Sequence, residues 1–233
     1  MAETPPSPSP SPSPPPRRLW IGVAVGIVAL GIFGAITEDV VNREPLTRFD
    51  TTLLESLHRS ATPGGLKLFA VISQVGSPVV MSVLALAGVL LLAVRREWIM
   101  LGGWVAAFAG GSLLDHWLKV AIHRPRPPYA PALLQQASWS FPSGHAMGSL
   151  VGYGMLAYVL LALAPRTRRF QWLIVSGSAL LIIAIGVSRL YLGVHYFSDV
   201  VGGYAAGVLW LSVCITGVEM GRRRQRQRLA SIT

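Results

Sequence analysis

Six long apolar runs constrain the fold of this chain more than any other feature of its sequence. A transmembrane helix needs about 17–25 predominantly apolar residues to cross the hydrocarbon core of a bilayer. Runs near this length occupy residues 19–36, 79–94, 98–114, 146–164, 170–187 and 200–218. Only 13% of the 233 residues are charged, and a soluble domain of this length needs far more charged surface. We therefore expect an all-α fold, an integral membrane six-helix bundle.

The segment between the first two runs predicts a short amphipathic helix on the membrane surface. Its apolar residues recur at helical spacing: Phe49, Leu53, Leu54 and Leu57. We interpret Asp50 and His58, in the same stretch, as solvated helix residues, with a functional role as the alternative. Further along, the apolar segment 66–75 could extend the second run upstream through the Gly76-Ser77-Pro78 break.

Most basic residues lie between alternate runs. The chain has 20 Lys and Arg residues against 10 Asp and Glu, a net charge of +10. Twelve of the 20 fall on one side of a six-span arrangement: Arg17, Arg18, Arg95, Arg96, Arg166, Arg168, Arg169, Arg222, Arg223, Arg224, Arg226 and Arg228. By the positive-inside rule this side is cytoplasmic, with both termini, so a multi-pass cell membrane protein is expected. Charge distributed in this way argues against nucleic acid as a partner.

The two ends of the chain differ in composition from its apolar centre. Pro and Ser alternate over residues 5–16, with too few apolar groups to fold, so residues 1–18 are predicted to be a disordered cytoplasmic tail. Residues 19–218 then form the six-span domain, and residues 219–233 form a basic cytoplasmic tail. The first run could instead be a signal peptide, but its length favours an uncleaved anchor.

Positive charge on the outer side opposes the topology rule and needs another explanation. In the segment KVAIHRPRP, residues 119–127, prolines end the helix and extend the backbone, which displays Arg124 and Arg126 on a stiff loop. Lys119 reaches back from the end of the third run. Three converging cations repel one another unless an anion lies between them, and phosphate suits the planar fork of arginine. The alternative is a cation cluster that touches lipid headgroups.

A second outer segment, FPSGHAMGSL from position 141, places a histidine at the start of an apolar run. Ser143 can cap the helix, and Gly144 permits close approach of the backbone. The free N–H groups at a helix start form an anion site, with His145 beside the bound anion. Taken alone, a histidine that anchors the helix end at the headgroups explains this segment equally well.

A third outer segment, SRLYLGVHYFSD from position 188, pairs a histidine with a carboxylate. His195 and Asp199 are four residues apart and would share one face of a helix. Asp199 can accept the Nδ1–H of His195, which leaves Nε2 free to attack. Arg189 adds another cation. A structural His–Asp pair is the alternative for this segment alone.

The three segments fall on one predicted face of the membrane, opposite the arginine-rich face. Together they supply four cations, a helix-start anion site, one histidine backed by a carboxylate and one without. Burying an arginine at mid-bilayer costs about 2.5–3.5 kcal/mol on insertion scales, and less at an aqueous edge. A phosphate site with a nucleophile and an acid accounts for the whole set, whereas no single structural alternative does.

These residues resemble the three motifs of the type 2 phosphatidic acid phosphatase family. The matching patterns are K-x6-R-P (Lys119, Arg126, Pro127), P-S-G-H (Pro142 to His145) and S-R-x5-H-x3-D (Ser188, Arg189, His195, Asp199). All three are complete and in the family's order, and the six-span layout is similar to that of its membrane-bound members. The resemblance extends over roughly residues 19–218.

The resemblance implies a role for each matched residue. His195 would be the nucleophile that forms a phosphohistidine, with Asp199 orienting it, and His145 would protonate the leaving oxygen. Phosphate oxygens would be bound by five residues: Lys119, Arg126, Ser143, Gly144 and Arg189. It also implies that no metal or other cofactor is needed. In the sequence, Asp115 and Asp199 are the only carboxylates near the motifs, too few for a typical magnesium or two-metal site.

The expected function is dephosphorylation of a lipid phosphate or diphosphate at the outer leaflet. Candidate substrates are undecaprenyl diphosphate, phosphatidylglycerophosphate and phosphatidic acid, with membrane lipids as the surrounding partners. One alternative is a phosphotransferase that uses the same phosphohistidine; another is a non-catalytic lipid-phosphate binder. Vanadium-dependent haloperoxidases have a similar anion pocket, but they are soluble proteins. The oligomeric state, the preferred lipid and the role of the Pro/Ser tail stay open.

Overall fold

The computed structural model describes residues 17–42, 45–131, 138–163 and 167–231. The predicted disordered tail falls almost entirely on residues 1–16, outside the described residues. Six helical segments in the described chain are long and apolar enough to cross a membrane. The prediction of an all-α six-span bundle is therefore confirmed.

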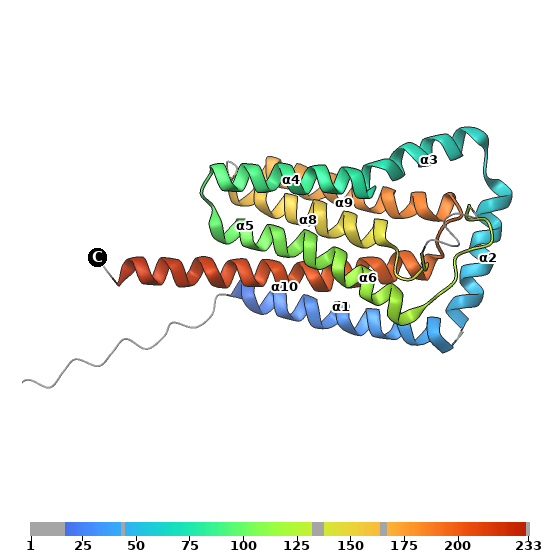
Figure 1. The fold of residues 1–233 in the computed structure, drawn as a ribbon, viewed down its shortest axis with the longest axis horizontal. Helices are drawn as coiled ribbons and strands as arrows, with labels where there is room; N and C mark the ends of the chain where they lie inside the picture. The colour runs from blue at the N-terminus through green and yellow to red at the C-terminus, as the bar shows by residue number, and fades with distance from the viewer. Residues whose placement is uncertain (1–16, 43–44, 132–137, 164–166, 232–233) are drawn as a thin grey trace, which may run out of the picture.

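The spanning segments pack side by side, as Figure 1 shows. The first is α1 (Arg17–Asn42), and the second consists of α3 (Pro63–Val75) and α4 (Pro78–Val94). The third combines α5 (Trp98–Val105), the π-helix η1 (Ala106–Gly110) and α6 (Gly111–Ile122). The last three are α8 (Gly144–Leu163), α9 (Arg168–Tyr191) and α10 (Phe197–Ala230).

The second span contains the break that the sequence predicts. Ser77 caps α4 by accepting a hydrogen bond from the Val80 N–H at 3.3 Å, with Pro78 in the first turn. Thr62 caps α3 in the same way, through the Gly65 N–H at 3.1 Å. The two helices follow one another as a single apolar segment, Pro63–Val94. The upstream extension of the second run is thus confirmed.

The π-turn in the third span lies directly before the residues that reach the outer end of the bundle. A π-turn widens the helix and leaves carbonyl groups without their usual partners. Trp210 Nε1, on α10, donates to the Ala106 and Ala107 carbonyl oxygens at 3.2 Å each. This contact holds the third span against α10 at the height where α6 begins.

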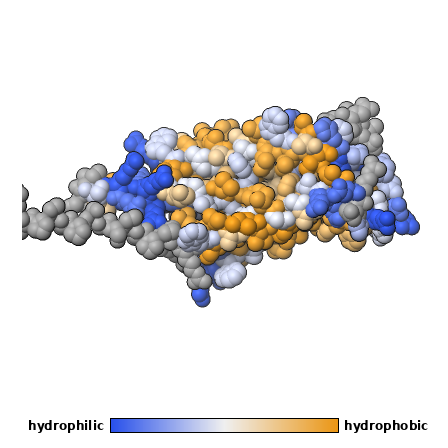
Figure 2. Space-filling model, turned by 90° about the horizontal axis from the view of Figure 1, so that it is seen from below, coloured by the Kyte–Doolittle hydropathy of each residue, from blue (hydrophilic) through white to orange (hydrophobic). Residues whose placement is uncertain are grey.

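The core lies where α5, α8 and α10 meet. Large side chains such as Trp104, Met100 and Met155 are 0–1% exposed there. Around this core the outward-facing side chains are apolar, and Figure 2 shows them as a broad hydrophobic belt between two polar ends. The burial of apolar surface inside and its exposure at the belt are what a bilayer requires of a spanning bundle.

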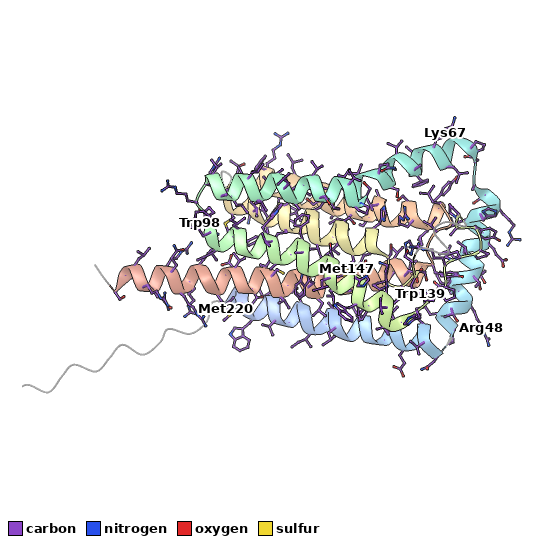
Figure 3. The ribbon with its side chains drawn as sticks, in the orientation of Figure 1. Arg48, Lys67, Trp98, Trp139, Met147 and Met220 are labelled. Atoms are coloured by element: carbon purple, nitrogen blue, oxygen red, sulfur yellow. The ribbon has the colours of Figure 1, made fainter. Side chains whose placement is uncertain are left out.

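The arginine clusters and the outer segments lie at opposite ends of the bundle. The α4–α5 connection, the start of α9 and the end of α10 lie at one end, and the α6–α8 and α9–α10 connections lie at the other (Figure 1). The labelled side chains follow this division: Trp98 and Met220 lie near one end, and Arg48 and Lys67 near the other (Figure 3). α10 continues to Ala230, so the basic segment predicted as a tail begins as part of this helix.

The predicted amphipathic helix is α2 (Pro45–Ser60), which crosses the end of the bundle where the motifs lie (Figure 1). Leu54 on it is 4% exposed. His58 is exposed as predicted, with its ring stacked on Tyr129 at 3.8 Å. The prediction for Asp50 is wrong, because this carboxylate is 1% exposed and hydrogen-bonded inside the protein rather than solvated.

Candidate active site

A cavity of about 390 Å³ lies between the spans toward the end of the bundle that carries the three outer motifs. Its deeper wall is apolar and comes from the second, third and fourth spans, with Met81, Phe108 and Val151 among the lining residues. Its polar wall gathers side chains from all three outer motifs and their neighbours: Asp115, Lys119, Arg126, Ser138, His145, Arg189 and His195. The predicted convergence of two histidines and three cations on one hollow is therefore present.

His195 lies in the connection between α9 and α10 with its two ring nitrogens facing different groups. Nδ1 is 3.4 Å from Asp199 Oδ2, and Nε2 is 3.3 Å from Arg126 Nη1. Burial lowers the pKa of the His195 imidazole to about 4, against the opposing effect of Asp199 and with the help of Arg189 and Arg126. The ring is therefore neutral near neutral pH. With the proton on Nδ1, Nε2 carries the lone pair, within hydrogen-bonding distance of Arg126 Nη1.

The His195–Asp199 pair forms through a helix cap rather than through a shared helix face. α10 begins at Phe197, so His195 precedes the helix. Asp199, in its first turn, turns back and accepts the Tyr196 backbone N–H at 2.8 Å on Oδ2, the oxygen that faces His195. The pairing predicted from the four-residue spacing is present, but its expected geometry, with both residues on one helix, is wrong.

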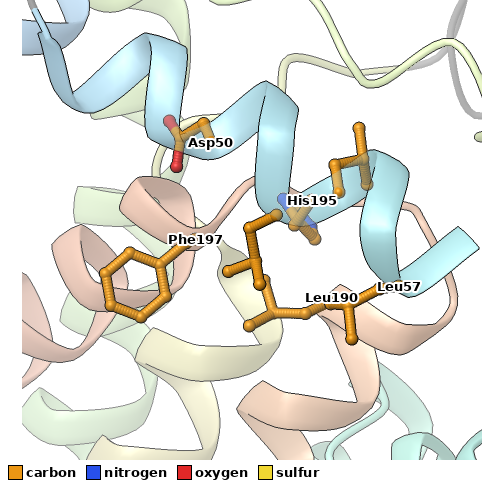
Figure 4. A pocket seen from close by; sticks show the side chains of 7 residues that line it. Asp50, Leu57, Leu190, His195 and Phe197 are labelled. Atoms are coloured by element: carbon orange, nitrogen blue, oxygen red, sulfur yellow. The ribbon is translucent and has the colours of Figure 1, made fainter.

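Behind His195 the site is closed by α2. Figure 4 shows Asp50 and Leu57 of α2 facing His195, Leu190 and Phe197. The space between these side chains leaves no room for a water molecule. The histidine is consequently only 2% exposed, and its ring is held between a dry apolar contact and the cavity.

The three cations of the cavity are each oriented by a neighbour. Lys119 Nζ lies 2.5 Å from both oxygens of Asp115, one turn earlier on α6. Arg189 Nη1 donates to Ser73 Oγ at 2.5 Å, and its Nε is buried with no partner among the described residues. These contacts leave donor groups available for an anion in the cavity.

Arg126 is held by the loop around it. Its Nε donates to the Ser138 carbonyl oxygen at 3.0 Å and its Nη2 to Ser138 Oγ at 2.7 Å. Its Nη1 donates to the Val194 carbonyl oxygen at 3.1 Å, next to His195. The guanidinium is thus locked in place beside the nitrogen of His195 that faces the cavity.

Arg124 does not join these cations, and the expectation that it converges with Lys119 and Arg126 on an anion is wrong. Its Nη1 donates to Asp199 Oδ1 at 2.5 Å, and its Nη2 donates to Asp50 Oδ2 at 2.8 Å. The two carboxylates outweigh the effect of burial and raise the pKa of Arg124.

The helix-start segment contributes to the cavity in different ways along its length. Gly144 and His145 line the cavity at the first turn of α8. A Cβ added at Gly144 would lie 3.0 Å from Lys119 Nζ and 3.1 Å from Asp115 Oδ2, so any larger residue would require these side chains to shift. Ser143 is fully buried and does not line the cavity; its N–H donates to the Asp199 carbonyl oxygen at 2.9 Å.

Three contributors to the site were not expected from the sequence: Asp50, Ser73 and Ser138. For Asp50 a signal existed, because positions 50, 54 and 57 share one helical face, and two of them are leucines. An acidic residue on the apolar face of an amphipathic helix indicates a buried partner. Ser73 and Ser138 stand in sequence contexts that give no such signal.

The chain resembles known proteins both in sequence and in fold. The PAP2 superfamily profile matches residues 98–223. Phosphatidylglycerophosphatase B of Bacillus subtilis is 36% identical over 121 residues, which cover 52% of this chain and 59% of that protein, less than two thirds of its length. Decaprenylphosphoryl-5-phosphoribose phosphatase of Mycobacterium tuberculosis is 30% identical over 155 residues, 63% of this chain and 75% of that protein.

Two solved structures share the arrangement of helices. A transmembrane PAP2-type phosphatidylglycerolphosphate phosphatase from Bacillus subtilis aligns with a TM-score of 0.69 at 26% identity, over 85% of this chain and 96% of that one. LpxE of Aquifex aeolicus aligns with a TM-score of 0.52 at 19% identity, over 72% and 94%, which shows a shared fold. Because the family profile spans more than half of the sequence, from the third span to the last, this chain belongs to the PAP2 superfamily.

Proposed function

We propose that this protein is a lipid phosphatase that removes phosphate from a lipid phosphate or diphosphate through a phosphohistidine on His195. One observation supports this most: His195 has Nδ1 toward a carboxylate and Nε2 toward a cavity that three cations and His145 also line. A binding protein has no need of a histidine oriented in this way. The relatives whose names state an activity are phosphatases of lipids, which supports the same reaction.

The proposed reaction has two steps. Nε2 of His195 attacks phosphorus, the bond from phosphorus to the lipid oxygen breaks, and His145 gives its proton to that oxygen. Water then attacks the phosphohistidine, its proton passes to His145, and the P–N bond breaks to release phosphate and His195. This reaction requires His145 to be protonated and His195 to be neutral when the lipid phosphate is bound, so a bell-shaped pH–rate profile is expected.

Positive groups around the phosphate would stabilise the transition state. Lys119, Arg126 and Arg189 reach the cavity, and the first turn of α8, whose N–H groups favour an anion, lines the same space with Gly144 and His145. Because the groups are already oriented by their neighbours, they need little rearrangement as charge develops on the phosphoryl oxygens. This chemistry assigns no role to a metal ion, and activity in a chelator tests that prediction.

We place the site on the extracytoplasmic side of the membrane. The arginine-rich end of the bundle would be cytoplasmic by the positive-inside rule, and the cavity lies at the other end. The phosphate of a lipid in the outer leaflet lies at a similar depth, and its tail could follow the apolar wall of the cavity. A reporter fused to the C-terminus should be active only in the cytoplasm, whereas activity outside would reverse this orientation.

The test of the proposed function is phosphate release by the purified protein in detergent with EDTA present. The substrates are phosphatidic acid, phosphatidylglycerophosphate and undecaprenyl diphosphate, each also supplied with an added lipid acceptor. Phosphate release without transfer to the acceptor is expected, and mass spectrometry of a phosphorylated acceptor would indicate a phosphotransferase instead.

Variants of two histidines complete this test. His195→Ala should lower turnover by about 10⁴-fold or more, as removal of a catalytic nucleophile does in other hydrolases, and should abolish an acid-labile phosphoenzyme. The matched control is His116→Ala, because His116 is exposed on α6 and does not line the cavity. Turnover that survives in the His195 variant would disprove the assignment of the nucleophile.

A further inference from the structure

The carboxylate of Asp199 is connected to α2 through a buried ionic network. Arg124 donates to Asp199 Oδ1 at 2.5 Å and to Asp50 Oδ2 at 2.8 Å. The side chains of Asp50 and Asp199 are both 0% exposed, and that of Arg124 is 10% exposed. We propose that Asp50 and Arg124 are positioning residues of the reaction, which hold Asp199 and, through it, His195 in the orientation needed for attack.

The network ties α2 to the first turn of α10 at two points. Asp50 Oδ1 accepts the Ser198 backbone N–H at 2.9 Å, and Asp50 Oδ2 accepts the Ser198 hydroxyl. Arg124 Nη1 also donates to Ser198 Oγ at 2.7 Å. Asp50 therefore binds Ser198, the residue next to Asp199, and it also binds Arg124, the arginine that donates to Asp199.

The bonds of Asp199 explain why this matters for His195. Asp199 Oδ2 faces His195 Nδ1 and accepts a hydrogen bond from the Tyr196 N–H. Asp199 Oδ1 accepts a hydrogen bond from Arg124 Nη1. A carboxylate held at both oxygens cannot rotate away from the imidazole. Arg124 also lies over the Tyr196 ring, 4.3 Å from its centroid, which limits its own movement.

The net charge of the network depends on both carboxylates. A single arginine shared by two buried carboxylates leaves a net negative charge on the group, and this charge favours the cationic form that His195 acquires as it attacks. Without Asp50, Arg124 would neutralise Asp199 alone and weaken that effect. The network thus supports both the orientation and the reactivity of the imidazole.

Two further observations set Asp50 apart from ordinary helix contacts. α2 lies outside the segment that the family profile matches, which begins at residue 98. Burying an unpaired carboxylate is costly, so an acidic residue on the apolar face of α2 is stable only while its partners are in place. The inference rests on the proposed phosphatase activity and adds to it a role for the helix that covers the site.

The experiment compares two ion pairs of the same helix region. The variants Asp50→Asn, Arg124→Gln and their double form a cycle, and the exposed pair Glu55–Arg59 of α2, 3.7 Å apart, forms the control cycle with Glu55→Gln and Arg59→Gln. For each protein, kcat and KM for lipid phosphate hydrolysis are measured with the thermal unfolding midpoint in the same detergent.

We expect each change in the network to lower kcat by about 10- to 100-fold, the usual cost of removing a residue that orients a functional side chain. KM should stay within about threefold, because neither residue lines the cavity. The double variant should be no slower than the slower single variant, since both changes break one unit. The control variants should stay within about twofold of the wild type and combine additively.

Two further variants keep the proposal testable if Asp50→Asn does not fold. Arg124→Lys retains the charge but lacks the planar fork whose separate nitrogens reach the two carboxylates, and Ser198→Ala removes only the shared hydroxyl; both should lower kcat, the second less. Folded variants of the network with wild-type kcat, or additive losses in its cycle, would overturn the inference. A wild-type protein that releases no phosphate would instead overturn the proposed function.

Discussion

α9 begins at one end of the bundle with Arg168 and Arg169, both exposed, and reaches the other end with Arg189, which is buried and bonded to Ser73. The same residue type on one helix thus meets two different environments. The effect of exposed arginines depends on how many there are, because solvent and salt screen the charge of each one. A buried arginine acts through its position, because its hydrogen-bond partners fix the place of its guanidinium group.

This difference teaches how the two ends of the protein use positive charge. At the arginine-rich end a cation can be moved along the chain by a residue or two with little consequence, since the positive-inside rule counts charges near the span ends. At the cavity, Lys119, Arg126 and Arg189 each have a defined neighbour and a defined direction.

The largest effect is expected from an exchange that keeps charge and changes only position. Arg189→Lys should lower kcat/KM by about 100-fold or more, comparable with the loss of a transition-state donor, because lysine cannot reproduce the guanidinium fork. The same exchange at the other end of α9, Arg168→Lys, should leave kcat/KM within about twofold. Phosphate release by both purified variants gives the comparison, and an equal loss in the two would remove the distinction between the ends.

A smaller effect is expected from one methyl group at the start of α8. Gly144→Ala places a Cβ 3.0 Å from Lys119 Nζ, so lysine must shift, and a tenfold or so fall in kcat/KM is expected from overpacking of this kind. Gly177→Ala is the matched control, since a Cβ there meets nothing within 4 Å. Should both variants keep full activity, the position of Lys119 would not limit the reaction.

The smallest effect is the response to moderate acid. The pKa of His195 is lowered to about 4, so its neutral, attacking form persists as the pH falls from 7 toward 5 and is lost only as the pH passes through about 4. The acid limb of kcat/KM should therefore lie well below the ordinary histidine value of about 6.5. The titration of the substrate phosphate is measured separately by ³¹P NMR in the same micelles and subtracted. If the acid limb, after subtraction of the substrate titration, lies near pH 6.5, burial does not lower the pKa of His195.

Much of this protein can be derived from the order of its residues. Hydropathy is a local and additive property, so the six spans and the extension of the second through residues 66–75 follow from composition along the chain. The three motifs indicate the family because each is short and continuous, and the spacing of the arginine clusters places all three at one end of the bundle. That single end explains why Lys119, His145 and His195 meet at a common cavity.

Other features depend on contacts between distant parts of the chain. Arg124 meets Asp199 across 75 residues, Arg189 meets Ser73 across 116, and Asp50 meets Ser198 across 148. Periodicity shows which face of a helix is apolar, but it does not show which helix packs against that face, or at what height. The apolar helical face that Asp50 shares with Leu54 and Leu57 indicates a buried partner, but only the packing of α2 across the bundle end reveals which partners these are. It also reveals that Arg124 binds carboxylates rather than phosphate, because burial converts a solvated charge into one that needs a partner.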